Sequence, residues 1–97
     1  MEQLTKERLE KYINLTNKAL NKVKIQKNGR INFEEAAKDF LDMANRYYKD
    51  ALYFKKNNQE INAFAAINYA HGWLDAGARI GLFDVDNDNV LFTVDPK

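Results

Sequence analysis

One row of polar side chains carries the residue types in this chain that most resemble an acid–base site. Residues 69–81 read YAHGWLDAGARIG and hold the only His and the only Trp of the chain. His71, Asp75 and Arg79 follow one another at steps of four, and Asn68 precedes His71 by three. Because side chains at such steps meet on a helix surface, Asp75 could accept hydrogen bonds from both His71 and Arg79. A carboxylate that orients an imidazole is a recurring element of acid–base catalysis.

Two interpretations of this polar column (Asn68, His71, Asp75 and Arg79) stay open. In one, the column is the site of a small enzyme or ligand-binding protein, with the C-terminal tail as a lid. In the other, Asp75 and Arg79 form a charge-assisted pair, and His71 is a polar residue at the edge of the core. We favour the second interpretation, because the sequence places no nucleophile beside the column and ion-pair networks often resemble functional sites. We therefore assign no catalytic residue and expect no cofactor.

Two stretches resemble calcium-binding loops, and neither is complete. The stretch 24–35 begins with Lys24, which would repel a cation at the first ligand position. In the second stretch, three carboxylates occupy ligand positions one, three and five: Asp84, Asp86 and Asp88. Position twelve is Asp95, which is shorter than the usual bidentate Glu, and Pro96 follows where an exiting helix should continue. We expect an acidic surface turn here and no metal site.

Three segments of helical period must position these residues. Apolar side chains recur at steps of three and four over residues 5–26, 33–56 and 59–81. Thr5 and Asn32 are suitable N-caps, while Asn28-Gly29 and Gly81 are suitable left-handed ends for the first and third helices. The expected fold is all-α: one helical domain over residues 1–97, built as an antiparallel up-down-up three-helix bundle. A short extended C-terminal tail, residues 84–97, would follow as a strand or pack on the helices.

The third helix differs from the others because it is apolar on two sides. One predicted core face contains Ala63, Phe64, Ile67, Ala70, Leu74, Ala78 and Leu82. A second row contains Ala66, Tyr69, Trp73, Ala76 and Ile80, and we call its last four residues the aromatic row. A helix with two apolar sides is either central or covered by a partner, so this row is a candidate interface. Gly72 and Gly77 suggest close packing of this helix against another one.

The composition narrows the function classes. The chain has 97 residues, 45% of them hydrophobic, and 15 basic against 14 acidic residues give a net charge of +1. That balance provides no general attraction for nucleic acid. The chain has no Cys, which excludes disulfides and thiolate metal sites. No apolar run is long enough to span a membrane, and we expect a cytoplasmic protein.

The segment YAHGWLDAGARIGLFDV, together with LFTV at residues 91–94, resembles the signature of a family of short archaeal proteins called domain of unknown function 357. This resemblance implies a compact three-helix bundle, loosely similar to small immunoglobulin-binding bacterial domains. It also implies an archaeal source and a cytoplasmic setting. It implies no activity, cofactor or catalytic residue.

These observations favour a non-enzymatic module that binds another protein, with a second copy of the chain as one candidate partner. The first alternative is the small ligand-binding protein or enzyme that would use the polar column. The second alternative is a nucleic-acid accessory protein, which would use basic residues near the end of the first helix: Lys18, Lys22, Lys24, Lys27 and Arg30. We do not expect nucleic-acid binding, because these residues wrap around the helix end and form no clear stripe.

Overall fold

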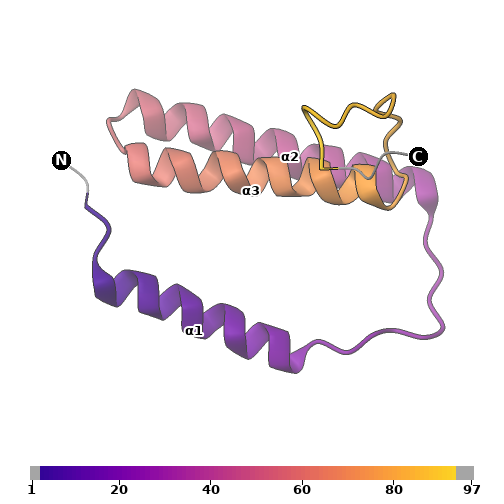
Figure 1. Cartoon of the computed structure of the whole chain (residues 1–97), viewed down its shortest axis with the longest axis horizontal. Coiled ribbons are helices and arrows are strands. Elements are labelled where there is room, and N and C mark those ends of the chain that lie inside the picture. Colours follow the sequence, from indigo (N-terminus) through magenta and orange to yellow (C-terminus); the bar gives the residue numbers. More distant parts are fainter. Residues whose placement is uncertain (1–2, 94–97) are drawn as a thin grey trace.

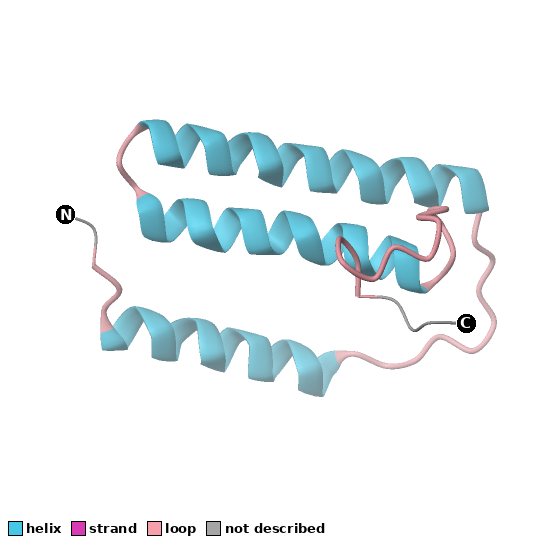
Figure 2. Ribbon diagram, turned by 45° about the horizontal axis from the view of Figure 1, so that its top comes forward, coloured by secondary structure: helices cyan, strands magenta, loops and turns pink. Residues whose placement is uncertain are grey.

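The computed structural model describes residues 3–93 as three helices followed by a tail that folds back. The helices are α1 (Lys6–Lys22), α2 (Phe33–Lys56) and α3 (Glu60–Arg79), and successive helices run in opposite directions (Figure 1 and Figure 2). No strand occurs among residues 3–93. The predicted all-α fold, with three helices in up-down-up order, is confirmed. Residues 94–97 of the predicted tail, including Asp95 and Pro96, lie outside the described residues.

Polar side chains start α1 and α2 as predicted. Thr5 Oγ1 accepts a hydrogen bond from the Arg8 amide at 3.1 Å. Asn32 Oδ1 accepts one from the Glu35 amide, also at 3.1 Å. Each bond satisfies one of the backbone N–H groups that the first turn of a helix leaves unpaired.

Left-handed residues follow the ends of α2 and α3. Gly81, just beyond α3, has a φ of 79°, and the amide of Leu82 donates to the Gly77 carbonyl at 2.8 Å. This bond spans the last turn and is typical of the Schellman motif, which needs a positive φ at the residue after the cap. The role predicted for Gly81 is confirmed, and Asn58, with a φ of 59°, takes the same place after α2.

The end of α1 differs from the prediction. The helix ends at Lys22, and Val23 is extended, although the sequence suggested a helix to residue 26 with a left-handed stop at Asn28-Gly29. Among the glycines of residues 3–93, Gly81 alone has a positive φ. Branched side chains such as Val23 and Ile25 lower helix propensity. Because no neighbouring helix covers these two side chains, nothing compensates for that cost.

Small residues form the seam between α2 and α3. The buried positions of the seam are Ala44 and Ala51 on α2 and Ala66 and Ala70 on α3. Gly77 of α3 is also buried, and the ring of Phe83 lies over it. Ala70 retains only 2% of its exposure. Because the distance between packed helices depends on the side chains at their contact, this seam lets the two backbones approach closely. Larger aromatic side chains therefore lie beside the seam.

This seam corrects the predicted core face of α3. Phe64 and Ile67 were expected to lie in the core with Ala70, but Phe64 is 69% exposed and Ile67 is exposed as well. The buried line instead runs between the two predicted apolar sides of the helix. A closely packed pair of backbones accommodates alanine and glycine and leaves no room for a phenyl ring at the contact.

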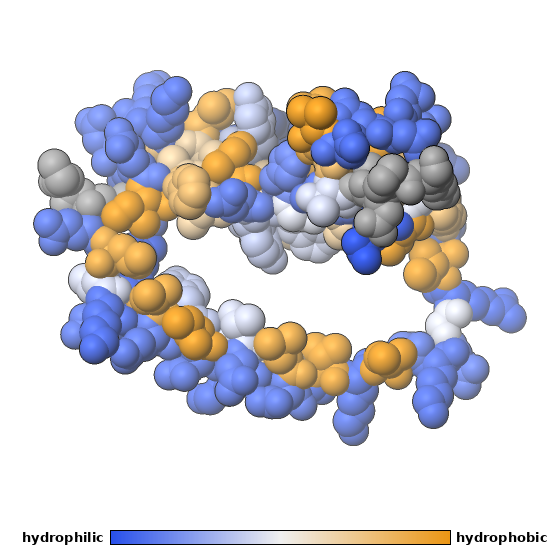
Figure 3. Space-filling view, in the orientation of Figure 1, coloured by the Kyte–Doolittle hydropathy of each residue, from blue (hydrophilic) through white to orange (hydrophobic). Residues whose placement is uncertain are grey.

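Helix α1 stands apart from the α2–α3 pair. No Cα atom of α1 lies within 8 Å of one in α2 or α3. Near the start of α1, Arg8 Nη2 donates to Asn62 Oδ1 of α3 at 2.8 Å. Farther along, its apolar stripe is uncovered, and Leu20 is 71% exposed. Figure 3 shows an open gap between α1 and the pair, with hydrophobic atoms along α1 beside it.

Candidate functional site

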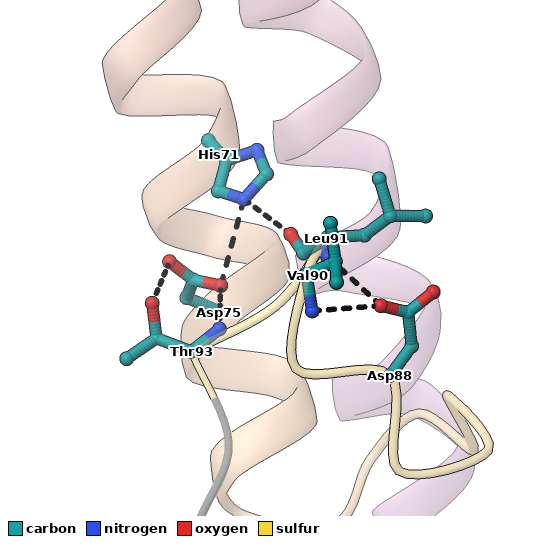
Figure 4. A network of polar contacts seen from close by, with 6 residues as sticks. All are labelled: His71, Asp75, Asp88, Val90, Leu91 and Thr93. Carbon is teal, nitrogen blue, oxygen red and sulfur yellow. Dashed lines mark hydrogen bonds and ion pairs between the residues drawn. The ribbon is translucent and has the colours of Figure 1, made fainter.

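The acidic segment after α3 folds through its own carboxylates. Asp84 Oδ1 accepts from the Asp86 amide at 3.1 Å. Asp88 Oδ1 accepts from the amides of Val90 and Leu91, each at 2.9 Å. Such side-chain bonds to nearby amides stabilise turns and compete with regular secondary structure. They turn the chain back along α3, so residues 90–93 lie beside the helix that carries the polar column (Figure 1 and Figure 4).

The tail binds two members of the polar column. His71 Nε2 lies 2.7 Å from the carbonyl oxygen of Leu91. Asp75 accepts twice from Thr93, at Oδ1 from the amide (2.9 Å) and at Oδ2 from the hydroxyl (3.3 Å). The ring of Phe92 stacks on His71 with a centroid distance of 6.4 Å. Figure 4 shows the contacts of Leu91 and Thr93, which hold the tail against one side of α3.

The contact with Leu91 determines which ring nitrogen of His71 carries a proton. A carbonyl oxygen only accepts, so Nε2 must carry the proton in this bond. Asp75 Oδ1 lies 3.6 Å from the same nitrogen, too far for a good hydrogen bond but close enough for a charge interaction when the imidazole is protonated. Thr93 supplies a hydroxyl, but its partner is Asp75. The arrangement therefore lacks the direct nucleophile–imidazole contact that activates a hydroxyl.

The column does not act as one unit. Asn68 borders a shallow hollow with Phe40 and Trp73, and no hydrogen bond within residues 3–93 joins it to His71 or Asp75. His71 borders a different hollow, of about 280 Å³, whose walls are mainly apolar. The expected pair between Asp75 and Arg79 is not formed among the described residues, and Asp75 bonds to Thr93 instead. Thr93 of the tail is therefore the partner of Asp75, in the place where the sequence predicted Arg79.

The calcium-like segment uses its carboxylates within the turns. Asp84 and Asp88 bond to backbone amides, and Asp86 and Asn87 adopt positive φ angles of 52° and 57°. Residues 3–93 contain no group of three His, Cys, Asp or Glu residues arranged to hold a metal ion. These side chains account for the turn that brings the tail to α3.

The aromatic row joins two rings of α2 to form an aromatic face. Phe40 meets Trp73 edge-to-face at 5.0 Å between centroids, and Tyr47 meets Tyr69 at 4.4 Å. Tyr69 also lies 6.3 Å from Trp73, so the four rings form a continuous chain. Edge-to-face contacts of this kind stabilise aromatic clusters beyond simple burial. Ala76 and Ile80 continue the row toward the end of α3, and both are exposed.

The aromatic face lies on the side of the α2–α3 pair that is turned toward α1. A groove of about 740 Å³ runs between them, lined by residues of all three helices. Leu4, Arg8 and Tyr12 border it from the start of α1, and Tyr47 and Tyr69 border it from the pair. Asn62, which Arg8 contacts, lies on the same helical line as Tyr69 and Trp73. The second apolar side of α3 therefore faces the gap.

Comparison with known protein families supports the resemblance seen in the sequence. Residues 11–83 match the family described as "Protein of unknown function (DUF357)". The chain belongs to the DUF357 family. Comparison with curated proteins gave no match, and neither did comparison with solved structures.

Sequence reasoning missed the partners of His71 and Asp75 in this DUF357 protein. It proposed a lid over the column but did not identify Thr93 or the Leu91 carbonyl as bonding groups. The available signal was the run of Asp84, Asp86 and Asp88 followed by an apolar tail, since such residues favour turns that reverse the chain. A backbone carbonyl has no signature in sequence, so its contact with His71 required the folded chain.

Removal of the Asp75 carboxylate is expected to free the tail. In Asp75→Ala, the Thr93 amide and hydroxyl both lose their acceptor, and the Thr93 amide should exchange with solvent about tenfold faster. NMR hydrogen exchange measures this rate, and far-UV circular dichroism should show unchanged helix content. Asp39→Ala removes a carboxylate of α2 and should leave the rate unchanged. Equal exchange rates at Thr93 in wild type and Asp75→Ala would contradict a fastening role.

Proposed function

We propose that this DUF357 protein is a non-enzymatic helical module that binds another protein through the aromatic face. The observation that carries the proposal is the partly exposed aromatic face, which lies opposite an exposed apolar stripe on α1. Tyr69 is 52% exposed, although it belongs to a cluster of four rings. Contiguous apolar surface of this kind marks protein interaction sites, and Trp and Tyr are prominent among the residues that dominate binding energy.

The polar column supports this proposal more than the enzymatic alternative. His71 donates from Nε2 to a backbone carbonyl, and Asp75 accepts from the tail, so both have a structural use. The hollow beside His71 has mainly apolar walls. Convergent polar groups in a cleft are typical of a site that orients a small substrate, and these two residues converge on the tail instead.

None of the three helices, over the residues that the structure describes, combines sufficient length with sufficient apolarity to cross a bilayer. The apolar side chains of α1 form a stripe on one side, as is usual for helices that pack against other helices.

A pair of matched tyrosine variants tests the proposed function. Tyr69 and Tyr48 are similarly exposed, at 52% and 49%, but Tyr48 borders the hollow on the His71 side. The full-length chain, immobilised and incubated with a lysate of its source organism, should retain a protein that mass spectrometry identifies. Tyr69→Glu should lose that protein and Tyr48→Glu should retain it. Equal retention by both variants would contradict binding through the aromatic face.

A further inference from the structure

We infer that the segment that covers the aromatic face is α1 of a second copy of this chain, exchanged between two molecules. The inference deepens the proposed function, on which it rests, by naming the partner. Three features of the described chain carry it: the match between α1 and the aromatic face, their complementary charges, and the exposed connection between α1 and α2.

The first feature is a match of length and character. At about 1.5 Å per residue, the 17 residues of α1 span about 25 Å. The groove and the aromatic row together extend along α3 from Asn62 to Ile80, about 27 Å by the same rise. The stripe of α1 is formed by apolar residues at helical steps: Leu9, Tyr12, Ile13 and Leu20. An amphipathic helix in an apolar groove is a common mode of recognition.

The second feature is charge. Residues 16–30 carry five basic side chains and no acidic one: Lys18, Lys22, Lys24, Lys27 and Arg30. The start of α2 is acidic, and among residues 3–93 neither Glu35 nor Asp39 forms an ion pair. Because α1 runs opposite to α2, the basic end of α1 and the acidic start of α2 lie toward the same end of the molecule (Figure 2). Complementary charge of this kind sets the register and orientation of a docked helix.

The third feature is the connection between α1 and α2. Residues 23–32 are exposed throughout and contain no helix. Ten residues in extended form reach about 33 Å, which is enough to place α1 on a neighbouring molecule. Every copy carries both a groove and a helix that fits it, so exchange between two copies satisfies both grooves in a closed symmetric pair. Such an exchange buries two α1 stripes, one from each molecule, and this enlarges the interface between them.

Two full-length variants with reversed charges test the exchange. One carries Lys18→Glu and Lys22→Glu in α1, and the other carries Glu35→Lys and Asp39→Lys in α2. Each variant alone brings like charges together, so its dimerisation should weaken about tenfold relative to wild type. In an equimolar mixture, α1 of each variant meets an oppositely charged groove on the other, and the dimer should return. Sedimentation velocity measures the mass, and fluorescence of Trp73, the only Trp, reports whether the aromatic face is covered.

The mixture separates exchange from closure within one chain. Recovery of the dimer only on mixing supports exchange, because a helix that closes on its own chain gains nothing from the other variant. A wild type that stays monomeric throughout the micromolar range overturns the inference, and so does a mixture that stays monomeric. If the monomer leaves Trp73 open to iodide quenching, the proposed function survives. If Trp73 is shielded in the monomer, α1 covers its own face, and the proposed function fails as well.

Discussion

Replacement of Trp73 by alanine is expected to lower the free energy of unfolding by about 2 kcal/mol. The indole meets Phe40 edge-to-face at 5.0 Å and Tyr69 at 6.3 Å, so its loss breaks the chain of four rings in the middle. Trp73 is only half-buried, which places the expected cost below that of a fully enclosed aromatic ring. Urea unfolding followed by far-UV circular dichroism, at one fixed protein concentration, measures the effect.

Phe64→Ala provides the matched control for Trp73→Ala. Phe64 also lies on α3, but it is 69% exposed and belongs to no ring contact described for residues 3–93. Its removal should change the free energy of unfolding by less than about 0.5 kcal/mol. If both variants lose the same stability, the aromatic cluster contributes nothing specific to the fold.

Gly77→Ala is expected to destabilise the protein by about 1 to 3 kcal/mol, against the usual advantage of alanine in a helix. A Cβ atom at Gly77 would overlap the ring of Phe83, whose Cδ2 would lie 2.6 Å away. Phe83 follows the end of α3 and folds back over Gly77, so the ring and its segment would have to move. The sequence suggested that this glycine allows another helix to approach, but the close neighbour is a side chain from the chain's own tail.

Gly72→Ala is the internal control for Gly77→Ala. A Cβ atom at Gly72 would meet nothing within 4 Å. Alanine there should raise the free energy of unfolding by up to about 1 kcal/mol, through helix propensity alone. Thermal and urea unfolding of the two variants measure the contrast. A stabilising Gly77→Ala would show that Phe83 moves away at no cost.

Local sequence signals identified most of the helix boundaries. Thr5 and Asn32 cap helices because a short polar side chain before an apolar run can accept from an exposed amide. Gly81 ends α3 because glycine adopts a positive φ without steric cost. Each of these residues acts within one or two turns of its own position, so the sequence contains all the information needed. The end of α1 was misplaced because it depends on whether other helices cover Val23 and Ile25.

The partners of the polar column could be predicted only in part from residues that are close in sequence. Steps of four bring His71 Nε2 to 3.6 Å from Asp75 Oδ1, but the hydrogen bond of His71 goes to the Leu91 carbonyl. The same reasoning paired Asp75 with Arg79, although Asp75 bonds to Thr93, 18 residues away. Competition between partners depends on which group arrives with better geometry, and that depends on the path of the tail.

The sequence by itself determined the three helices, their order, the two apolar sides of α3 and membership of the DUF357 family. These follow from helical period, capping chemistry and a distinctive segment, all of which are local properties of the chain. Only the tertiary structure decided which side of α3 meets α2, that Phe83 occupies the space over Gly77, and that the tail fastens to His71 and Asp75. It also placed α1 away from the pair, leaving the aromatic face open. These outcomes depend on the closest approach of two backbones and on contacts between distant residues, which no helical period specifies.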